Sequence, residues 1–310
     1  MSLTVLRTAD GSWYVATPSG AAKIPTAAKT TAELLADRAA IAAAGPATGS
    51  VQDLALVSPV TAPCRVVAQM TNFASHVTDS GMDPKTVPLT FFRKTSGSIS
   101  GPFDDVVKPA HVRLLDYEVE IGLVIGREIP VGSEISAPAE YVAGLVVTDD
   151  VSARDVQLPQ TQFYEAKSYP AFTPVGPALV LLEPGEFERF ADLRLRLSVN
   201  GSVRQDSVVG ADMIHRPLEA LRALTRFQRL DPGDLVLTGT PAGTALSAPP
   251  KAVEKLASLL PPALKWKLFF KGQAKNPKYL ADGDVVEASI ATDDGLLDLG
   301  TQRTVVRYQR

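Results

Sequence analysis

The sequence predicts an α+β fold that is mainly β, with short helices. Most apolar residues lie in short runs of strand length that turn residues separate, and the 310 residues include 24 Pro and 22 Gly. Such a turn-rich composition argues against an all-helical bundle. The runs do not alternate regularly with helix-length segments, as they would in a doubly wound parallel sheet. We therefore expect a mixed architecture that consists mainly of strands.

Length, charge and cysteine content restrict the class of protein. A chain of 310 residues is long enough for two domains and a large core, so its stability requires neither disulfides nor a structural metal. The formal net charge of −3 gives no electrostatic case for nucleic-acid binding. The single cysteine, Cys64, excludes an intrachain disulfide framework and suits a reducing cytoplasm. Since no apolar run approaches the roughly 18 residues of a membrane span, we expect a soluble, cytoplasmic protein.

The first 60 residues are predicted to form a small N-terminal α+β domain. Residues 3–25 contain short strand-like runs around an Asp-Gly dipeptide, which is typical of hairpin turns. A helix is predicted over 31–44, because Thr30 begins a Thr-x-x-Glu capping box and a Gly-Pro pair follows the segment. A Gly-, Pro- and Ser-rich stretch then leads into the main domain, residues 61–310.

The main domain contains most of the strand signals. A hairpin is predicted around Asn200-Gly201, since Asn-Gly between alternating runs favours a two-residue turn. One helix is predicted near 212–227, with Asp212 placed to favour its N-terminus. The predicted strands fall within residues 114–126, 141–152, 177–183, 194–207, 233–243 and 283–290.

A strand with three acidic residues is the first candidate for chemistry. Asp116, Glu118 and Glu120 alternate with apolar residues, so a strand would place all three on one face. Neighbouring carboxylates would lie about 6–7 Å apart and repel by roughly 2–3 kcal/mol at an effective dielectric constant of about 20. A bound cation would reverse this repulsion. The alternative is an exposed face with solvated charges, because alternation of apolar and polar residues is ordinary in strands.

A second acidic pair favours a metal site. Asp149 and Asp150 follow the apolar run 143–148, and solvation alone explains poorly why carboxylates lie at the end of a buried strand. Three or more carboxylates without a cluster of Cys or His favour Mg²⁺, Mn²⁺ or Ca²⁺ over zinc.

Four motifs, in this order, resemble the fumarylacetoacetate hydrolase (FAH) family. They are LDYEVEIGLVIG (115–126), TDDVSARDVQ (148–157), AKSYPAFTPVGP (166–177) and LTGTPAGT (237–244). The resemblance runs from about 65 to 247, resumes at 280–290, and points to the group of acylpyruvases, fumarylpyruvate hydrolases and 2-hydroxyhepta-2,4-diene-1,7-dioate isomerases. It implies an FAH-type mixed β-roll, a divalent ion that is usually Mg²⁺, and a homodimer.

The resemblance also implies the metal ligands. The acidic strand supplies Glu118 and Glu120, and the second motif supplies Asp150. Asp149 stands where the family commonly has Asn, so Asp150 is the predicted ligand of this pair.

His76 is the candidate base among three histidines. Asp79 follows it by three residues, a spacing that lets a carboxylate orient an imidazole on a helical turn. Without further context a lone histidine is more often a structural or surface residue. The family's lid segment carries a His–Glu dyad that activates water, so the resemblance implies this role for His76, with Asp79 in place of the usual Glu. Met70 and Phe73 replace the usual Gly and Tyr, which affects the predicted substrate preference more than the predicted metal site.

The lysine motif makes Lys167 a further candidate. A lysine beside a metal can stabilise a developing enolate or bind a carboxylate, and the alternative is a surface lysine in a loop. Pro170 stands where the family often has Asp. Gln157 and Thr240 match family positions that contact polar groups of the substrate. Further candidate contacts to a substrate carboxylate are Arg93, Lys94 and Ser96.

The resemblance and these residues predict a Mg²⁺-dependent enzyme that acts on a small 1,3-dioxo or 2-oxo acid of the acylpyruvate or fumarylacetoacetate type. The predicted reaction is hydrolysis of a C–C bond by attack of water and release of an enolate. Two further hypotheses stay open: a decarboxylase or keto–enol isomerase with the same enolate chemistry, and a non-catalytic metal-binding subunit. The expected partner is the small-molecule substrate, with no nucleic acid and no membrane.

Residues 248–279 form a basic insertion between two family-like segments. They hold seven of the 13 lysines and one acid, Glu254. One interpretation is a solvated basic excursion. The other is a flap or dimer-edge element whose Trp266, Phe269 and Phe270 cover the site and whose charge attracts anionic substrates.

Deletion of residues 250–276 tests these two interpretations. If the insertion covers the site, the KM for a dianionic substrate rises and depends less on salt, because a source of electrostatic attraction is lost. Steady-state kinetics of the intact and shortened chains at several salt concentrations measure this effect. An unaltered KM and salt dependence would favour the solvated excursion.

Overall fold

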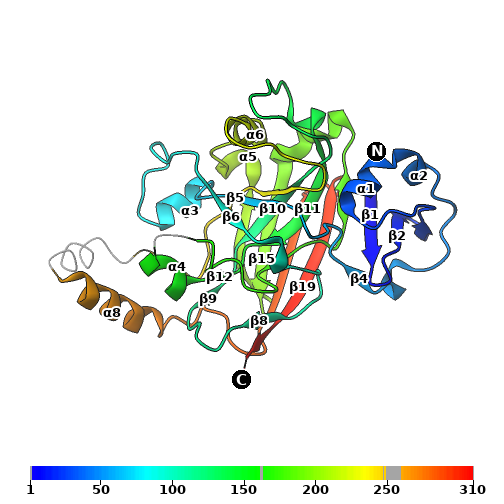
Figure 1. Cartoon of the computed structure of the whole chain (residues 1–310). Coiled ribbons are helices and arrows are strands. Elements are labelled where there is room, and N and C mark those ends of the chain that lie inside the picture. The colour runs from blue at the N-terminus through cyan, green and yellow to red at the C-terminus, as the bar shows by residue number, and fades with distance from the viewer. Residues whose placement is uncertain (1, 161–162, 247, 249–259, 310) are drawn as a thin grey trace.

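Two β-sheets form the body of the protein (Figure 1). The computed structural model describes residues 2–160, 163–246, 248 and 260–309. The larger sheet has ten strands and the smaller sheet has five. Across the larger sheet the order is β3 (Gly20–Lys23), β2 (Trp13–Thr17), β1 (Leu3–Thr8), β14 (Leu179–Leu181), β11 (Val142–Asp149), β10 (Val119–Ile125), β17 (Leu235–Leu237), β5 (Val66–Gln69) and β6 (Phe91–Lys94), with β4 (Leu56–Val57) beside β1.

Four of the five strands of the smaller sheet come from residues 193–308. Its strands are, in order, β16 (Ser202–Val208), β15 (Leu193–Val199), β18 (Val285–Thr292), β19 (Asp298–Tyr308) and β8 (Val106–Lys108). Two short strand pairs complete the β structure. They join β9 (Leu115–Asp116) to β12 (Ser152–Ala153) and β7 (Ile99–Ser100) to β13 (Thr173–Pro174).

The larger sheet is covered on both faces. One face packs on the smaller sheet, where Ile121, Leu195 and Ile290 belong to one buried core. The other face packs on the helices α1 (Thr31–Ala36) and α2 (Arg38–Ala42) of the N-terminal segment. Every residue of the central strands β10 and β11 is therefore buried, which explains why these strands are almost continuously apolar.

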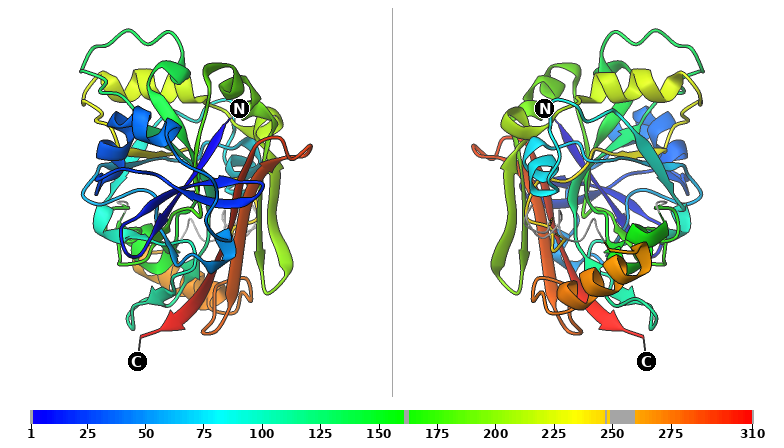
Figure 2. Two further views of the ribbon diagram at one scale, coloured as in Figure 1. Left: turned by 90° about the vertical axis from the view of Figure 1, so that its right-hand side faces the viewer. Right: turned by 90° about the vertical axis from the view of Figure 1, so that its left-hand side faces the viewer.

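The helices are short and lie outside the sheets. The helices α3 (Ala74–Asp79), α4 (Arg154–Gln160) and α8 (Pro262–Gln273) lie on the side opposite the N-terminal segment, and the right-hand view of Figure 2 looks onto them. The helices α5 (Val209–Asp212) and α6 (Pro217–Thr225) lie near one end of the larger sheet. No helix within the described residues is long and apolar enough to cross a membrane.

The predicted α+β, mainly β, fold is confirmed, and each predicted strand range contains a strand. The hairpin around Asn200 and Gly201 joins β15 to β16, and both turn residues have the positive φ that this turn requires. The strand-like runs of residues 3–25 form β1, β2 and β3. Since β1 pairs with β14, the N-terminal segment extends the larger sheet, and the division into domains at residues 60 and 61 stays a prediction.

The single helix predicted over 31–44 is wrong. The capping box at Thr30 is present, but the helix ends at Asp37 and a second helix begins there. The Asp37 side chain accepts a hydrogen bond from the backbone N of Ala40 at 3.2 Å, so it caps α2. Asp is more favourable at the N-cap of a helix than in its interior, because its side chain can accept a hydrogen bond from a backbone N–H a few residues further along.

The helix predicted near 212–227 is also wrong in its extent. The predicted range contains α6, which begins only at Pro217 and ends at Thr225, and it overlaps α5 at Asp212 alone. Pro217 occupies the first turn of α6, where proline is favoured. Asp212 does not begin this helix; instead it ends α5 and accepts a hydrogen bond from the backbone N of Ser75 at 2.7 Å. His215 lies between the two helices and not within either.

The longest strand, β19, was not predicted. It pairs antiparallel with β18 and parallel with β8. Its buried positions include Gln302 and Thr304, and Gly300 lies between buried and exposed residues, so the apolar alternation is weak. Tertiary packing, and not a sequence period, therefore defines this strand.

Candidate functional site

Three buried carboxylates from two neighbouring strands meet at one point. Glu118 directly precedes β10, Glu120 lies within it, and Asp150 directly follows β11. Because β10 and β11 are antiparallel, with Val119 opposite Asp149, the start of one strand meets the end of the other. One oxygen from each of the three carboxylates lies within 4.8 Å of the others.

Two buried lysines contact these carboxylates. The Lys167 Nζ lies 2.7 Å from Glu118 Oε2 and 2.5 Å from Asp150 Oδ2. The Lys94 Nζ lies 2.5 Å from Asp150 Oδ1 and donates to the Phe172 carbonyl at 2.8 Å. Burial disfavours the charge on Lys167, but the Asp150 and Glu118 carboxylates outweigh it and raise the pKa of Lys167. Burial lowers the pKa of Lys94.

Arg154 is the third buried cation of the site. Its guanidinium donates from Nε to Asp116 Oδ2 at 2.8 Å and from Nη1 to Gln157 Oε1 at 2.9 Å, and Nη2 donates to Glu118 Oε1. Burial alone would raise the pKa of Glu118, but Arg154 and Lys167 hold it below its usual range. Glu118 is therefore an ionised carboxylate.

Glu120 differs from its neighbours because no cation of the described residues pairs with it. Its Oε2 accepts a hydrogen bond from the backbone N of Gly239 at 2.7 Å. Burial, followed by the charges of Asp150 and Glu118, raises the pKa of Glu120 well above its usual range. A cation placed among these oxygens would offset the repulsion from Asp150 and Glu118 and favour the ionised form of Glu120.

The charges of the buried site fit a divalent ion. Asp149 is also buried, its Oδ1 accepts from the backbone N of Glu118 at 2.7 Å, and burial raises its pKa to about 7. When all carboxylates are ionised, two negative charges have no buried cation to balance them. The members of this carboxylate cluster are Asp116, Glu118, Glu120, Asp149 and Asp150, and its cations are Lys94, Arg154 and Lys167. Three hard oxygen ligands and this charge difference suit Mg²⁺, Mn²⁺ or Ca²⁺.

The alternative of a solvated acidic face is wrong, because Asp116, Glu118 and Glu120 are all at least 95% buried. The expectation that all three share one strand face stays a prediction. Strand pairing is interrupted between β9 and β10, and Asp116, which is paired with Arg154, is not part of the group of three possible metal ligands.

His76 lies half-buried on α3, near the charged groups. Burial is the main cause that lowers the pKa of His76. The negative charge of Glu118 raises this pKa, and the positive charges of Arg154 and Lys167 lower it. The imidazole is therefore neutral at pH 7 and able to accept a proton. Asp79 is exposed at the end of α3, and the described structure has no hydrogen bond or ion pair between it and His76. The predicted dyad stays a prediction.

The start of α3 is held by polar contacts of Asp212 and Asn72. Asp212 accepts from the backbone N and the hydroxyl of Ser75, at 2.7 and 2.5 Å. Asn72 donates to the carbonyls of His215 and Thr238 and accepts from the backbone N of His215 at 2.8 Å. These contacts fix the direction in which α3 leaves the end of β5.

The predicted substrate-binding residues divide into two groups. Lys94 lies in the buried cluster, and Gln157 lies beside it through its bond to Arg154. The Thr240 hydroxyl donates to the Val119 carbonyl at 2.9 Å, which leaves it as an acceptor only. Arg93 is exposed, because it alternates with Lys94 along β6 and faces the other way. Ser96 is half-buried at the start of a short 3₁₀ helix, Ser96–Ser98.

Sequence reasoning missed Arg154, Gln205 and Asn72. Arg154 lies inside the second motif, and a buried arginine beside a predicted carboxylate group could have been inferred from the charge balance. Gln205 donates to Thr240 Oγ1 at 2.8 Å and accepts from the backbone N of Val119 at 3.0 Å. Nothing in the sequence of its hairpin arm signals that role.

The basic insertion is only partly described, because residues 249–259 lie outside the described residues. Its aromatic residues contact one another on α8: the ring centroids of Trp266 and Phe270 are 5.5 Å apart. The Arg113 guanidinium lies 5.8 Å from the Phe270 ring. The described lysines of the insertion are exposed.

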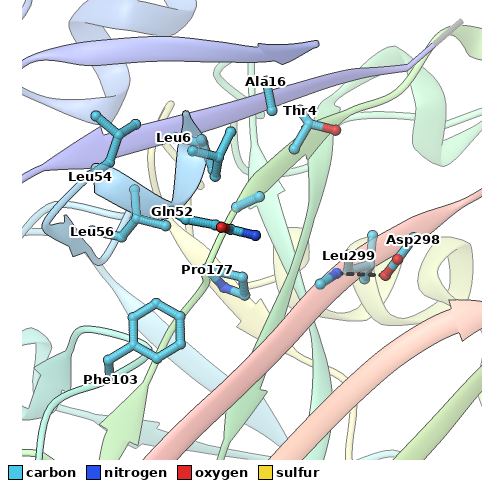
Figure 3. Close-up of a pocket in the computed structure, with 13 residues that line it drawn as sticks. Thr4, Leu6, Ala16, Gln52, Leu54, Leu56, Phe103, Pro177, Asp298 and Leu299 are labelled. Atoms are coloured by element: carbon cyan, nitrogen blue, oxygen red, sulfur yellow. Dashed lines mark hydrogen bonds between the residues drawn. The ribbon is translucent and has the colours of Figure 1, made fainter. Parts of the chain in front are cut away.

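A cavity of about 560 Å³ lies elsewhere, between the N-terminal segment and β19 (Figure 3). Its lining is mainly apolar, with Leu6, Leu54, Phe103 and Leu299, and Gln52 extends into it. None of the predicted site residues lines this cavity. This cavity is therefore separate from the carboxylate cluster.

Comparison with known proteins identifies the family. The family profile described as fumarylacetoacetate (FAA) hydrolase C-terminal matches residues 65–307. The chain belongs to the fumarylacetoacetate hydrolase family. The family resemblance of the four motifs is thereby confirmed.

Curated relatives and a solved structure have related names. The chain is 35% identical over 200 residues to "Oxaloacetate tautomerase Fahd2a, mitochondrial" of Rattus norvegicus; the match covers 63% of this chain and 61% of that protein. It is 34% identical over 253 residues to 2,4-didehydro-3-deoxy-L-rhamnonate hydrolase of Sphingomonas sp. (strain SKA58), covering 81% and 76% of the two chains. A crystal structure of a probable 2-hydroxyhepta-2,4-diene-1,7-dioate isomerase from Mycobacterium abscessus matches with a TM-score of 0.75, 29% identity and full coverage of both chains.

The chain thus spans about three fifths of the length of the rat protein that it matches. The named members of this FAH family are tautomerases, hydrolases and isomerases. The prediction that the chain is an enzyme of this family is confirmed.

Replacement of Glu120 by Gln tests the metal site. Without an ion, we expect the free energy of unfolding at pH 7 to increase by about 1 kcal/mol, because a buried carboxylate without a cationic partner is removed. Affinity for Mg²⁺ should fall at least roughly tenfold, because a hard ligand is lost. Thermal melts with and without Mg²⁺ and calorimetric titration measure these opposite effects.

Glu128→Gln is the matched control, since Glu128 is exposed beyond the other end of β10. It should alter neither stability nor affinity for the ion. Unchanged Mg²⁺ affinity in Glu120→Gln would contradict the ligand role of Glu120.

Proposed function

We propose that the protein is a divalent-ion-dependent hydrolase that cleaves a C–C bond in a small 1,3-dioxo or 2-oxo acid. The observation that carries this proposal is the buried group of Glu118, Glu120 and Asp150 beside Lys167, with the neutral His76 nearby. The group has the ligand chemistry and the charge for a divalent ion, Lys167 supplies a fixed positive charge, and His76 can accept a proton. C–C hydrolysis requires all three.

A divalent ion held by Glu118, Glu120 and Asp150 would supply Lewis-acid polarisation of a substrate carbonyl. The residues of the chain account for the remaining steps. His76 takes a proton from water, and the resulting hydroxide adds to the carbonyl carbon. The bond between this carbon and the neighbouring carbon then breaks, giving a carboxylic acid and an enolate. The Lys167 ammonium stabilises the enolate oxygen, and His76 returns its proton to the enolate carbon.

Keto–enol tautomerisation of an oxo diacid is the second candidate. It needs proton transfer at carbon but no attacking water. His76 alone supports it, because a neutral imidazole that can accept a proton at carbon suffices, whereas the contact of Asp79 with His76 stays a prediction. The similarity to the rat oxaloacetate tautomerase supports the same candidate.

Decarboxylation and a non-catalytic role have less support. Decarboxylation of a 2-oxo acid would use the same enolate stabilisation, and no further feature of the site favours it. A non-catalytic metal-binding subunit is disfavoured, because the named relatives are enzymes. The proposal retains a homodimer and a small anionic oxo acid as the partner, both of which the family resemblance implies, and the cytoplasmic location expected from the sequence.

Product analysis tests the proposal directly. The protein is incubated with a panel of 2,4-dioxo acids and with oxaloacetate, with and without Mg²⁺, and the products are identified by mass. Hydrolysis gives two acid fragments with the mass of one added water, decarboxylation gives loss of CO₂, and tautomerisation leaves the mass unchanged. Mg²⁺-dependent acid fragments are the expected result.

His76→Ala tests the base. We expect C–C hydrolysis to fall by about 10²–10⁴, the usual loss on removal of a general base, with Mg²⁺ affinity close to that of the wild type. Asp79→Asn should cause a smaller loss, since it changes only the orientation and basicity of the imidazole. Decarboxylation of a 2-oxo acid should tolerate His76→Ala much better.

His111→Ala is the control, because His111 is exposed and its Nε2 contacts the Tyr169 hydroxyl at 2.8 Å. It should leave the rate unchanged. Near-normal hydrolysis by His76→Ala at saturating Mg²⁺ would show that another group activates the water.

The pH dependence of kcat/KM gives an independent test of His76. Only the neutral imidazole accepts a proton, so the rate should fall as the pH decreases through the pKa of His76. Because burial lowers this pKa, the midpoint should lie below the ordinary value of 6.5. This acid limb should be absent from the residual activity of His76→Ala, and a limb that persists there would belong to another group.

A further inference from the structure

Asp116 is buried in the site but is not placed as a metal ligand. Its Oδ1 accepts from the backbone N of Tyr117 at 2.9 Å and of Ala245 at 2.7 Å. Its Oδ2 accepts from the backbone N of Leu246 at 3.0 Å and from Arg154 Nε at 2.8 Å. A carboxylate has about four acceptor sites, so these bonds use all of them. The side chain therefore holds other groups in place.

One group that Asp116 holds is the bridging loop, which we define as residues 239–246. The loop contacts the metal-ligand group directly, because the backbone N of Gly239 donates to Glu120 Oε2 at 2.7 Å. It also contacts the start of α3, because the backbone N of Ala242 donates to the Ser75 hydroxyl at 3.0 Å. Just beyond the loop, the backbone N of Ala248 donates to the Asp79 carbonyl at the end of α3, at 3.2 Å.

The bridging loop has little freedom to move independently. Gly243 has a φ of +106°, and a Cβ atom there would lie 1.9 Å from the Arg204 carbonyl oxygen. Only glycine allows this close approach to β16. The Tyr117 hydroxyl donates to the Gly243 carbonyl at 3.2 Å, from the residue that follows Asp116. Displacement of one part of the loop is thus transmitted to the rest.

The basic insertion is attached at the same place. The Asn276 side chain donates to the Ala245 carbonyl at 2.8 Å, and the backbone N of Leu280 donates to the Leu115 carbonyl at 2.9 Å. The C-terminal end of the insertion is therefore fixed beside Asp116.

Arg154 connects Asp116 to the nearer metal ligand of the acidic strand. Its planar guanidinium binds Asp116, Glu118 and Gln157 through three different nitrogens. Because the guanidinium is rigid, a change in the position of Asp116 changes the direction in which Arg154 holds Glu118. Lysine cannot bind three partners in this fixed arrangement.

We propose that Asp116 is a positioning residue that couples binding of the divalent ion to the placement of α3, and hence of His76. The coupling runs from Glu118 through Arg154 to Asp116, and from Asp116 through the bridging loop to Ser75 at the start of α3. Glu120 provides a second link, to Gly239. An ion that fixes Glu118 and Glu120 therefore stabilises α3, and by linkage the fixed α3 increases affinity for the ion. This inference rests on the ion site of the proposed function.

Amide hydrogen exchange with Mg²⁺ or Mn²⁺ alone tests the coupling without substrate. In the wild type, saturating ion should slow exchange of the α3 amides and of Ala245 and Leu246. In Asp116→Asn, which keeps the size of the side chain but loses acceptor sites, this ion-dependent slowing in α3 should disappear. Affinity for the ion should fall roughly 10- to 100-fold, as for other residues that orient metal ligands. With a dioxo acid, kcat should fall more than KM changes.

Asp212→Asn is the matched control, because Asp212 holds α3 through Ser75 without contacting the carboxylate cluster. It should speed exchange in α3 both with and without ion, so that the slowing caused by the ion persists, and it should lower the ion affinity much less than Asp116→Asn does, because no contact to a metal ligand is lost. Arg154→Lys keeps the buried charge and breaks the same chain of contacts, so it should behave as Asp116→Asn and serves if that variant does not fold.

Three outcomes separate this inference from the proposed function. If the ion protects α3 in the wild type but not in Asp116→Asn, the coupling holds, even where no hydrolysis of any oxo acid is found. If the ion binds without slowing exchange in α3, or if the slowing persists in both variants, the coupling is wrong while hydrolysis can still hold. If no divalent ion binds, both are wrong.

Discussion

The site depends on the burial of unbalanced charge where β10 begins and β11 ends. The register that places Val119 opposite Asp149 brings carboxylates from two strands to one point inside the protein. An isolated buried carboxylate costs several kcal/mol, so such a group requires cations or must lose its charge. Lys94, Arg154 and Lys167 come from separate segments of the chain and all end at this point. The surrounding segments therefore take their positions from the carboxylates, and the remaining negative charge leaves a place for a divalent ion.

Much of the fold was predictable from local patterns. Runs of strand length, the Asn200-Gly201 turn and the Thr30 capping box all have a local physical cause, and the structure contains each of them. Helix extent was less predictable, because the side chain of Asp37 ends one helix by capping the next. The strand β19 was not predictable, since its buried positions include polar residues that bond only in the folded chain: Gln302 donates to the carbonyls of Val147 and Pro174.

In the site, too, the positions set by local sequence patterns were predictable, and the positions set by contacts between distant residues were not. The three predicted metal ligands do lie together, because alternation along one strand and the end of a neighbouring strand place them. Asp116 belongs to the same alternation, but it binds Arg154 and is not one of the three possible metal ligands. Strand pairing is interrupted directly after it. The roles of Arg154 and Gln205 depend on contacts between residues more than 30 positions apart, which no local pattern contains.

The carboxylates with Lys167 and the helix that carries His76 are held in place in different ways. The carboxylates and Lys167 lie in the core, where strand pairing and ion pairs determine each position. His76 lies on a short helix that is held by Asn72, by Asp212 and by the loop after β17. In the proposed function, stabilisation of the enolate would depend on the core group of carboxylates and Lys167, and the choice between attack of water and proton transfer at carbon would depend on where α3 places His76. A change in the contacts of α3 should therefore alter the balance between hydrolysis and tautomerisation while the metal-ligand group stays the same.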